Sequence, residues 1–265
     1  MKPPVVQSSL LELAGTAREQ YEAHQNEWWM VRPSAPVLFF GNLAGYEASC
    51  PRIATVGLNP SQHEFPSPSE DPFLRFPNAD SDDAAVYLSV LSSYFRNCPY
   101  RSWFGSYEEV LQGMGATYYG AEENTALHTD IGSVLSTNPT WNKLDIQTRN
   151  QLTREGVPLW HDLIRCLQPD ILFASIAWKW MNDGTIQLEP CASWEVIHTF
   201  EKKKEYRPRK SPVEIKARWY MHSTGHRFLI AHGRASQTPL GLLSNEQKRT
   251  AGCKILAHWQ ETRKD

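Results

Sequence analysis

Apolar residues recur along the chain in two spacings, as short continuous runs and at positions three or four residues apart. The continuous runs predict strands at 52–57, 126–131, 170–176 and 227–231, with a shorter candidate at 36–40. The helical spacing predicts helices at 8–29, 81–95, 107–113, 148–167 and 245–261. Because helices separate the strands, right-handed crossovers would join parallel strands. We therefore expect a three-layer α/β/α fold around a central four-stranded, mainly parallel sheet.

The length of the chain, 265 residues, is enough for one large domain with an ample core. We expect a single domain over 1–265 with an N-terminal helical extension at about 1–35. A polar and basic stretch at about 182–220 is predicted to be an insertion. The loop at 62–78 is rich in Pro and Ser and carries three phenylalanines, and loops of that length are more often functional than simple connections.

The strand at 52–57 runs into a tight turn, Gly57-Leu58-Asn59-Pro60-Ser61. Such a turn holds Asn59 at the carboxyl end of a strand, where open α/β sheets place their ligands. The side chain of Asn59 can orient a water with its carbonyl while its amide binds a substrate oxygen. The alternative is an Asx-type turn that only closes the strand.

Composition excludes several classes of protein. No apolar run approaches the roughly 18 residues of a membrane span, and the N-terminus lacks the apolar core of a signal peptide. The five cysteines are scattered without a C-x-x-C pair, which argues against a disulfide framework, a zinc site or an iron–sulfur cluster. We expect a reduced, cytoplasmic protein without metal or cofactor.

Charge is distributed unevenly along the chain. Residues 1–150 carry 9 basic and 17 acidic side chains, a net −8, whereas residues 151–265 carry 18 and 12, a net +6. The basic excess is densest at 202–210, which includes Lys203 and Arg209. This run is either a solvated loop or part of a rim that binds phosphates.

Polar groups follow three of the predicted strands in order: Gly57-Leu58-Asn59-Pro60-Ser61, then His128-Thr129-Asp130, then His232-Gly233-Arg234-Ala235-Ser236. Together they resemble the uracil-DNA glycosylase superfamily. The turn at Gly57 is similar to that family's Gly-x-x-Pro motif, closest to the Gly-Ile-Asn-Pro form of its mismatch-specific branch. The segment at 232–236 is similar to its His-Pro-Ser motif, and the leucine-rich helix, Pro-Asp and strand at 163–172 are similar to its middle. The resemblance covers about residues 50–260.

Three departures from the family pattern affect the expected chemistry. Gly233-Arg234 stands where Pro-Ser would follow the histidine, and Asp130 stands where the family usually has an Asn that reads uracil. Asn59 also replaces the aspartate of the most active uracil enzymes.

The resemblance implies an enzyme that hydrolyses the N-glycosidic bond of a base flipped out of duplex DNA and leaves an abasic site. Asn59 would position the attacking water. His232 would donate a hydrogen bond to the pyrimidine O2 as negative charge develops there. The alternative for His232 is a buried histidine that caps a strand end.

Asp130 bears on the substrate. An ionised Asp only accepts hydrogen bonds, which suits the exocyclic amine of a cytosine-type base and opposes the O4 of uracil. The base would be a modified cytosine, because excising ordinary cytosine would be lethal. The alternative is that Asp130 is structural and Asn138 reads the base.

The remaining candidates are assigned to base and DNA contacts. Phe65 and Phe76 are candidates for stacking on the base, or else they close the loop onto the core. Arg234 or Leu240 would fill the gap left by the flipped nucleotide. Ser61 and Ser236 would bind phosphates.

The sequence leaves three functions open. The first is a monofunctional DNA glycosylase for a modified cytosine, such as the glucosylated hydroxymethylcytosine of some phage DNA, which would make the protein an antiviral defence enzyme. The second is a repair glycosylase for uracil or mismatched bases. The third is a catalytically inactive DNA-binding module of the same fold. We expect a monomer.

Overall fold

The computed structural model describes residues 7–66, 71–120, 124–181, 184–201, 211–222 and 224–263. The chain divides into two compact units. Unit 1 comprises Met1–Ala48, Val56–Tyr100 and Leu127–Gln168, and unit 2 comprises Ser49–Thr55, Arg101–Ala126 and Pro169–Asp265. Strand β1 (Ile53–Gly57) contributes residues to both units.

Within the described residues the central sheet has seven strands rather than the expected four. Its order is β4 (Leu127–Asp130), β1, β5 (Ile171–Ala174), β9 (Arg227–Gly233), β8 (Val213–Met221) and β6 (Glu189–Pro190), and β7 (Glu195–Phe200) pairs with β8. The four predicted strands β4, β1, β5 and β9 are neighbours in this order, and β5 pairs with β9 in parallel. The chain is therefore a mixed α/β protein whose additional strands are antiparallel.

These additional strands come from the stretch that the sequence suggested was an insertion. Strand β8 pairs antiparallel with β9 over the register Ile215↔Gly233 to Met221↔Arg227, and β6 and β7 pair antiparallel with β8. In β8 the side chains of Val213, Ile215 and Ala217 are buried, and the residues between them are half-buried. This alternation is typical of a strand with one covered face, and the charged residues on the other face disguised it.

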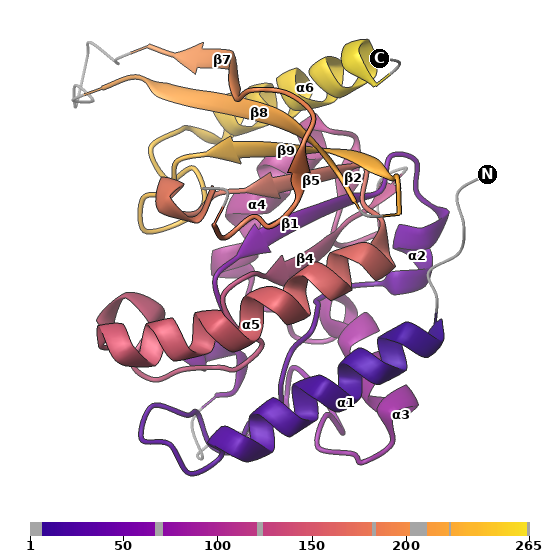
Figure 1. Cartoon of the computed structure of the whole chain (residues 1–265), viewed down its shortest axis with the longest axis vertical. Helices are drawn as coiled ribbons and strands as arrows, with labels where there is room; N and C mark the ends of the chain where they lie inside the picture. The colour runs from indigo at the N-terminus through magenta and orange to yellow at the C-terminus, as the bar shows by residue number, and fades with distance from the viewer. Residues whose placement is uncertain are drawn as a thin grey trace. The chain divides into compact units, whose positions relative to one another are not determined.

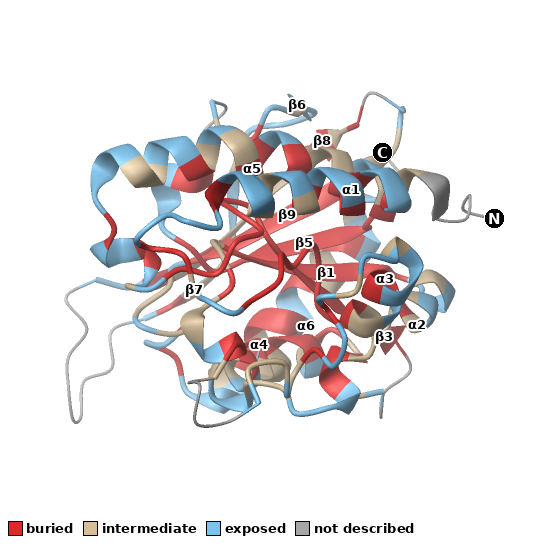
Figure 2. Cartoon of the chain, turned by 90° about the horizontal axis from the view of Figure 1, so that it is seen from below, coloured by how far each residue is buried: buried red, intermediate tan, exposed pale blue. Residues whose placement is uncertain are grey.

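The described residues of unit 1 form four α-helices. They are α1 (Gln7–His24), α2 (Leu43–Ala48), α3 (Ala84–Ser92) and α5 (Ile146–Leu167). Helices α1 and α5 lie side by side (Figure 1), and the His24 ring contacts the Glu155 carboxylate at 2.6 Å. Both helices expose residues along one side (Figure 2), which accounts for the helical spacing of their apolar residues.

Three predicted boundaries in unit 1 differ from the structure. The first helix ends at His24 rather than at residue 29. The predicted helix at 81–95 is divided into α3 and a 3₁₀ turn, η2 (Tyr94–Arg96). The strand candidate at 36–40 makes only a single bridge, from Phe40 to His128.

Unit 2 contains α4 (Arg101–Gly113) and α6 (Asn245–Thr262), which pack directly on each other (Figure 1). A Cβ atom on Gly252 would lie 2.0 Å from the carbonyl oxygen of Val110, so the two backbones are in contact there. The unit also has a parallel pair, β2 (Ala116–Thr117) with β3 (Asn124–Thr125), and a 3₁₀ turn η4 (Trp178–Met181). In the part of the chain that the structure describes, no helix is long and apolar enough to cross a membrane.

We expect Gly156→Ala to destabilise unit 1, because a Cβ atom there would lie 2.2 Å from the carbonyl oxygen of Gly132. Because this clash is with backbone atoms, it can be relieved only if the backbone of α5 or of Gly132 shifts. The free energy of unfolding should therefore fall by about 1–3 kcal/mol. Gly15→Ala in the exposed part of α1 is the matched control, since nothing lies within 4 Å. It should stabilise by about 0.5–1 kcal/mol. Urea unfolding of both variants tests this, and an unaffected Gly156→Ala protein would contradict the packing of α5.

Candidate active site

The carboxyl end of β1 meets β4 at Gly57, within unit 1. A Cβ atom at Gly57 would lie 2.3 Å from Asp130 Oδ1 and 2.9 Å from His128 Nε2. The backbone amide of Ile131 donates to the Gly57 carbonyl at 3.1 Å, which fixes the two strand ends together. Glycine is required here because two side chains of β4 occupy the space of its missing side chain.

Asp130 and His128 are both buried where they lie over Gly57, and Asp130 is only 6 % exposed. Asp130 Oδ1 is 3.6 Å from His128 Nε2. The alternative reader, Asn138, has an exposed side chain, and its backbone amide donates to Trp29. The structure therefore brings Asp130, rather than Asn138, to the end of β1.

Asn59 is half-buried in the turn that follows β1. Its amide nitrogen donates to the carbonyl oxygens of Pro60 at 2.9 Å and Leu135 at 3.2 Å, and to Thr137 Oγ1 at 3.1 Å. The amide thus holds the turn against the segment after β4 and is not available to a substrate oxygen, contrary to the expectation from sequence. Within the described residues the Asn59 carbonyl oxygen has no hydrogen bond, so it can accept one from a water.

A carboxyl group that the sequence analysis missed, Glu64, belongs to the same unit. It lies on a 3₁₀ turn, η1 (Gln62–Glu64), which Ser61 caps by accepting from the His63 amide. Glu64 is 3 % exposed, and Tyr94 donates its hydroxyl hydrogen to Glu64 Oε2. The only available signal was its position in the Phe-rich loop, and a single Glu in a loop usually faces solvent.

Burial raises the pKa of Glu64 to about 8. The hydrogen bond from Tyr94 and the positive charge of Arg75 lower this pKa, and the negative charge of Asp130 raises it. Glu64 is therefore mostly protonated at pH 7. We call Gly57, Asn59, Glu64, His128 and Asp130 the β1–β4 cluster. It offers the carbonyl oxygen of Asn59 and two carboxyl groups, of which Glu64 is mostly neutral at pH 7.

Aromatic rings pack beside the β1–β4 cluster. The Phe76 ring is stacked on Phe65 at 5.3 Å and on Tyr94 at 4.9 Å, so both of its faces are covered. Phe76 is fully buried and cannot stack on a base in this conformation, which favours the alternative that it closes the loop onto the core. Phe65 is also buried, with one face on Phe76 and an edge contact to Phe73.

His232, at the end of β9 in unit 2, has a different environment from the one expected. It is 4 % exposed, and its Nε2 lies 2.9 Å from the carbonyl oxygen of Ile176. A carbonyl only accepts, so Nε2 carries the hydrogen, and Nδ1 of the neutral ring is an acceptor. The pKa of His232 is lowered to about 4, mainly by burial. The hydrogen bond to Ile176 raises this pKa in part, and the positive charge of Lys216 contributes to lowering it. The ring's hydrogen is already bound to Ile176, so it is not offered to a pyrimidine O2.

The predicted DNA contacts have mixed outcomes. Leu240 is fully buried and packs against Gly233, and its amide donates to Ser175 Oγ, so it is not a wedge in this conformation. Arg234 is exposed and Ser236 is half-buried. The Ser61 hydroxyl already accepts from the His63 amide, although it keeps its hydrogen for a phosphate. Lys203 and Arg209 lie outside the described residues.

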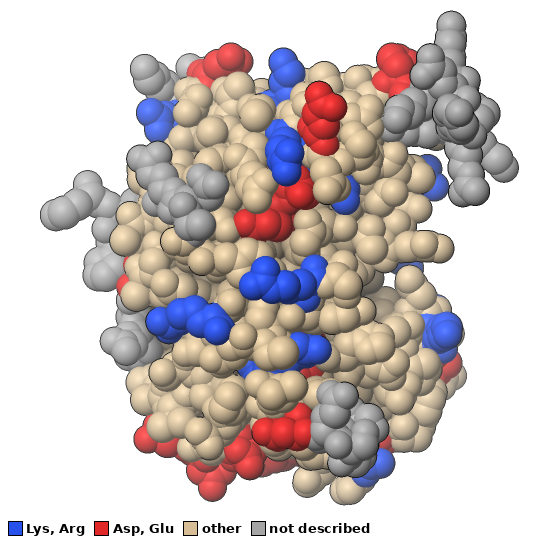
Figure 3. All heavy atoms as spheres, turned by 180° about the vertical axis from the view of Figure 1, so that it is seen from behind, with Lys and Arg blue, Asp and Glu red and all other residues tan. Residues whose placement is uncertain are grey.

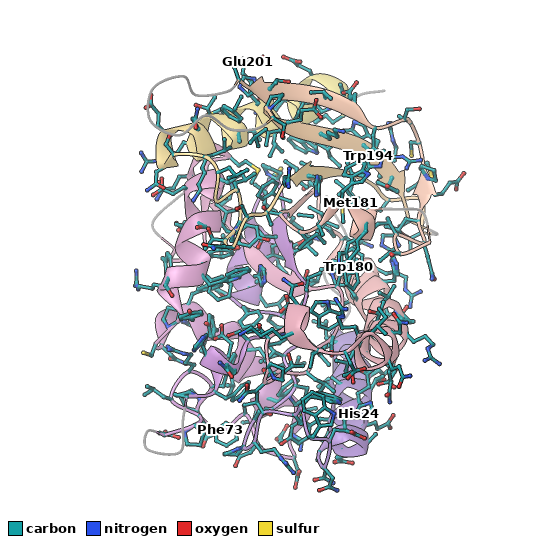
Figure 4. The ribbon with its side chains drawn as sticks, turned by 90° about the vertical axis from the view of Figure 1, so that its left-hand side faces the viewer. His24, Phe73, Trp180, Met181, Trp194 and Glu201 are labelled. Carbon is teal, nitrogen blue, oxygen red and sulfur yellow. The ribbon has the colours of Figure 1, made fainter. Side chains whose placement is uncertain are left out.

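An aromatic group in unit 2 lies against His232. Trp178 is 46 % exposed, and its ring lies 5.0 Å from His232 and 5.1 Å from Trp194. Lys216 Nζ is 4.9 Å from the Trp178 ring. In the same turn, Trp180 and Met181 are buried, and Figure 4 labels both together with Trp194. On the face shown in Figure 3, basic side chains form small groups and not one continuous basic surface.

A separate cavity of about 240 Å³ in unit 1 contains none of the predicted site residues. Its lining includes Arg18, Tyr21, Phe73 and Asp80. Arg18 donates to Asp82 and to the carbonyl oxygen of Ser81, so its charge is already paired. We take the β1–β4 cluster as the candidate active site because it contains the predicted residues Gly57, Asn59 and Asp130.

The sequence matches no model of a known protein family, and no characterised protein matches it either. The functional assignment therefore depends on the residues themselves.

We expect Asn59→Asp to destabilise the protein, because a carboxylate would replace a donor that faces three acceptors. The cost should be about 2 kcal/mol at pH 7 and should shrink at low pH, where a protonated Asp can donate to one acceptor. Asn138→Asp, at an exposed side chain, is the control and should be nearly neutral. Equal melting temperatures for the two variants at pH 7 would contradict this role of the Asn59 amide.

We expect His232 to make stability depend on pH. The ring of the unfolded chain takes up a proton as the pH falls through about 6.5, whereas the folded ring does so only near 4. Stability from this group is therefore present above pH 6.5 and lost as the pH falls toward 4, by up to about 3 kcal/mol. Relative to wild type, His232→Gln keeps a donor for Ile176 and should lose this dependence. If the free energy of unfolding changed equally with pH in both proteins between pH 7 and pH 4, this role of His232 would be refuted.

Proposed function

We propose that the protein is a monofunctional DNA glycosylase of the uracil-DNA glycosylase superfamily. It would hydrolyse the N-glycosidic bond of a flipped modified cytosine and leave an abasic site. Glucosylated hydroxymethylcytosine, as in phage DNA, fits the proposal as substrate and implies a role in antiviral defence. The β4-β1-β5-β9 core with helical crossovers is consistent with the three-layer fold of that superfamily.

The observation that carries the proposal is the position of Asp130 over Gly57. A carboxylate that is buried at a strand end, with glycine beneath it, is more constrained than a solvated surface Asp. An ionised carboxylate accepts a hydrogen bond from the cytosine N4 amine and repels the O4 of uracil. The position of Asp130 therefore supports a cytosine-type base, rather than uracil, as the substrate.

Asn59 supplies the second part of the chemistry. Its carbonyl oxygen has no hydrogen bond to any residue that the structure describes, and its amide is fixed by Pro60, Leu135 and Thr137. A carbonyl held in this way orients a water and places its negative end toward the sugar, which becomes positively charged as the base leaves. Asn59 is not a base, so departure of the leaving group must account for most of the rate.

The second candidate is a DNA-binding module that has the fold without the chemistry. It is favoured by His232, whose hydrogen is bound to the carbonyl of Ile176 and which stays neutral at physiological pH. The repair of uracil by way of Asn138 has less support, because that side chain is exposed and apart from the Gly57 contact.

Base release, followed by mass spectrometry, tests the proposal. The substrates are duplexes that contain uracil, cytosine, hydroxymethylcytosine or glucosylated hydroxymethylcytosine. We expect release only from the modified cytosines, and a loss of at least about 100-fold in Asn59→Ala, the size typical of removing one electrostatic contact to a transition state. Release from none of these duplexes would move the assignment to the binding module.

Two matched variants identify the residue that reads the base. Asp130→Asn should lower release of the modified cytosines and raise release of uracil, because an amide can both donate and accept. Asn138→Ala should leave both rates unchanged. The opposite result would make Asn138 the reader.

A further inference from the structure

Glu64 is a buried acid held by a chain of hydrogen bonds. Tyr94 donates its single hydroxyl hydrogen to Glu64 Oε2, and the Tyr94 oxygen accepts from the Tyr100 amide at 2.9 Å. Glu64 Oε1 makes no hydrogen bond within the described residues. The neutral acid can therefore carry its proton on Oε1 and donate it to a ligand.

Glu64 and Asp130 belong to one cluster. The Phe40 ring lies 5.5 Å from His128 and 4.9 Å from Tyr94, so it connects the β4 side chains to the partner of Glu64. The charges that act on Glu64 are those of Asp130 and Arg75. Arg75 is held in place by the His63 carbonyl oxygen, to which it donates at 3.0 Å, and by Cys98.

The edge of cytosine presents two different groups side by side, the N4 amine as donor and N3 as acceptor. Asp130 can accept from the amine. A neutral acid would complement N3, whereas a second carboxylate would repel it. Uracil presents the reverse order at these positions, with a donor at N3 and an acceptor at O4.

We propose that Glu64 is the general acid of the reaction and gives its proton to N3 of a cytosine-type base as the glycosidic bond breaks. This assignment rests on the proposed function. It also supplies the activation of the leaving group that the environment of His232 does not provide.

The step is balanced as follows. The bond between C1′ of the sugar and N1 of the base breaks, and its electron pair goes to the base. The proton of Glu64 moves to N3, so the base leaves as a neutral tautomer and Glu64 becomes a carboxylate. A water held by Asn59 forms the new bond to C1′ and releases its proton to solvent, from which Glu64 is protonated again.

The protonation state agrees with this role. With a pKa of about 8, Glu64 holds its proton at neutral pH and loses it as the pH rises through 8. The rate of base release should therefore fall above about pH 8. A general acid typically contributes 10²–10⁴-fold to the rate.

Glu64→Gln tests the assignment, because the amide keeps a hydrogen bond for N3 and for Tyr94 but has no proton to transfer. In single-turnover assays we expect a rate about 10²–10⁴-fold lower on modified-cytosine duplex, with DNA binding within about threefold of wild type. The residual rate should no longer fall between pH 7 and 9. Glu155→Gln, at the ion pair with His24 on α5, is the control and should match wild type.

Tyr94→Phe provides an independent test that does not depend on Glu64→Gln folding. The Tyr94 hydrogen bond lowers the pKa of Glu64. Its removal should therefore move the alkaline limb of the pH–rate profile, where base release falls, to higher pH than in wild type. Two results would overturn the assignment and leave the proposed glycosylase activity intact. One is Glu64→Gln activity within twofold of wild type. The other is a pH–rate profile whose alkaline limb is unchanged in both Glu64→Gln and Tyr94→Phe. A wild-type protein that releases no base would remove both.

Discussion

The close approach of two strands at Gly57 is the contact on which the proposed chemistry depends. Because this residue has no side chain, Asp130 and His128 of β4 lie directly over the backbone at the end of β1. A Cβ atom would occupy the position of the Asp130 carboxylate. The same strand end leads into the turn that holds Asn59. Gly57 therefore determines where the Asp130 carboxylate and the Asn59 side chain lie relative to the backbone.

The two acids of this region have different surroundings. Burial favours the neutral form of Glu64, and the hydrogen bond from Tyr94 opposes it only in part. Asp130 lies at a strand end beside an imidazole. Pairs of carboxyl groups in unlike environments are a common way for an enzyme to hold an acceptor and an acid together at one pH.

The environments of Asn59 and His232 do not match the chemical roles that the family resemblance implied for these two residues. The Asn59 amide is used to close its own turn, and the His232 hydrogen is bound to a backbone carbonyl. Neither group can be assigned from its type alone, because each has two functional ends and the fold decides which end is left free. The aromatic side chains show the same dependence, since Phe76 lies between two other rings.

By itself the sequence determined the alternation of helices with β1, β4, β5 and β9, because buried parallel strands are continuous apolar runs and helices repeat every 3.6 residues. It also located Gly57, Asn59, Asp130 and His232 at strand ends. It did not show that 189–221 extends the sheet, since charges on the outer face of β8 hid the alternation. Only the tertiary structure decided that Glu64 is buried, that Leu240 is core and which atoms of Asn59 and His232 are occupied. These properties depend on contacts between residues far apart in the chain, which local patterns do not encode.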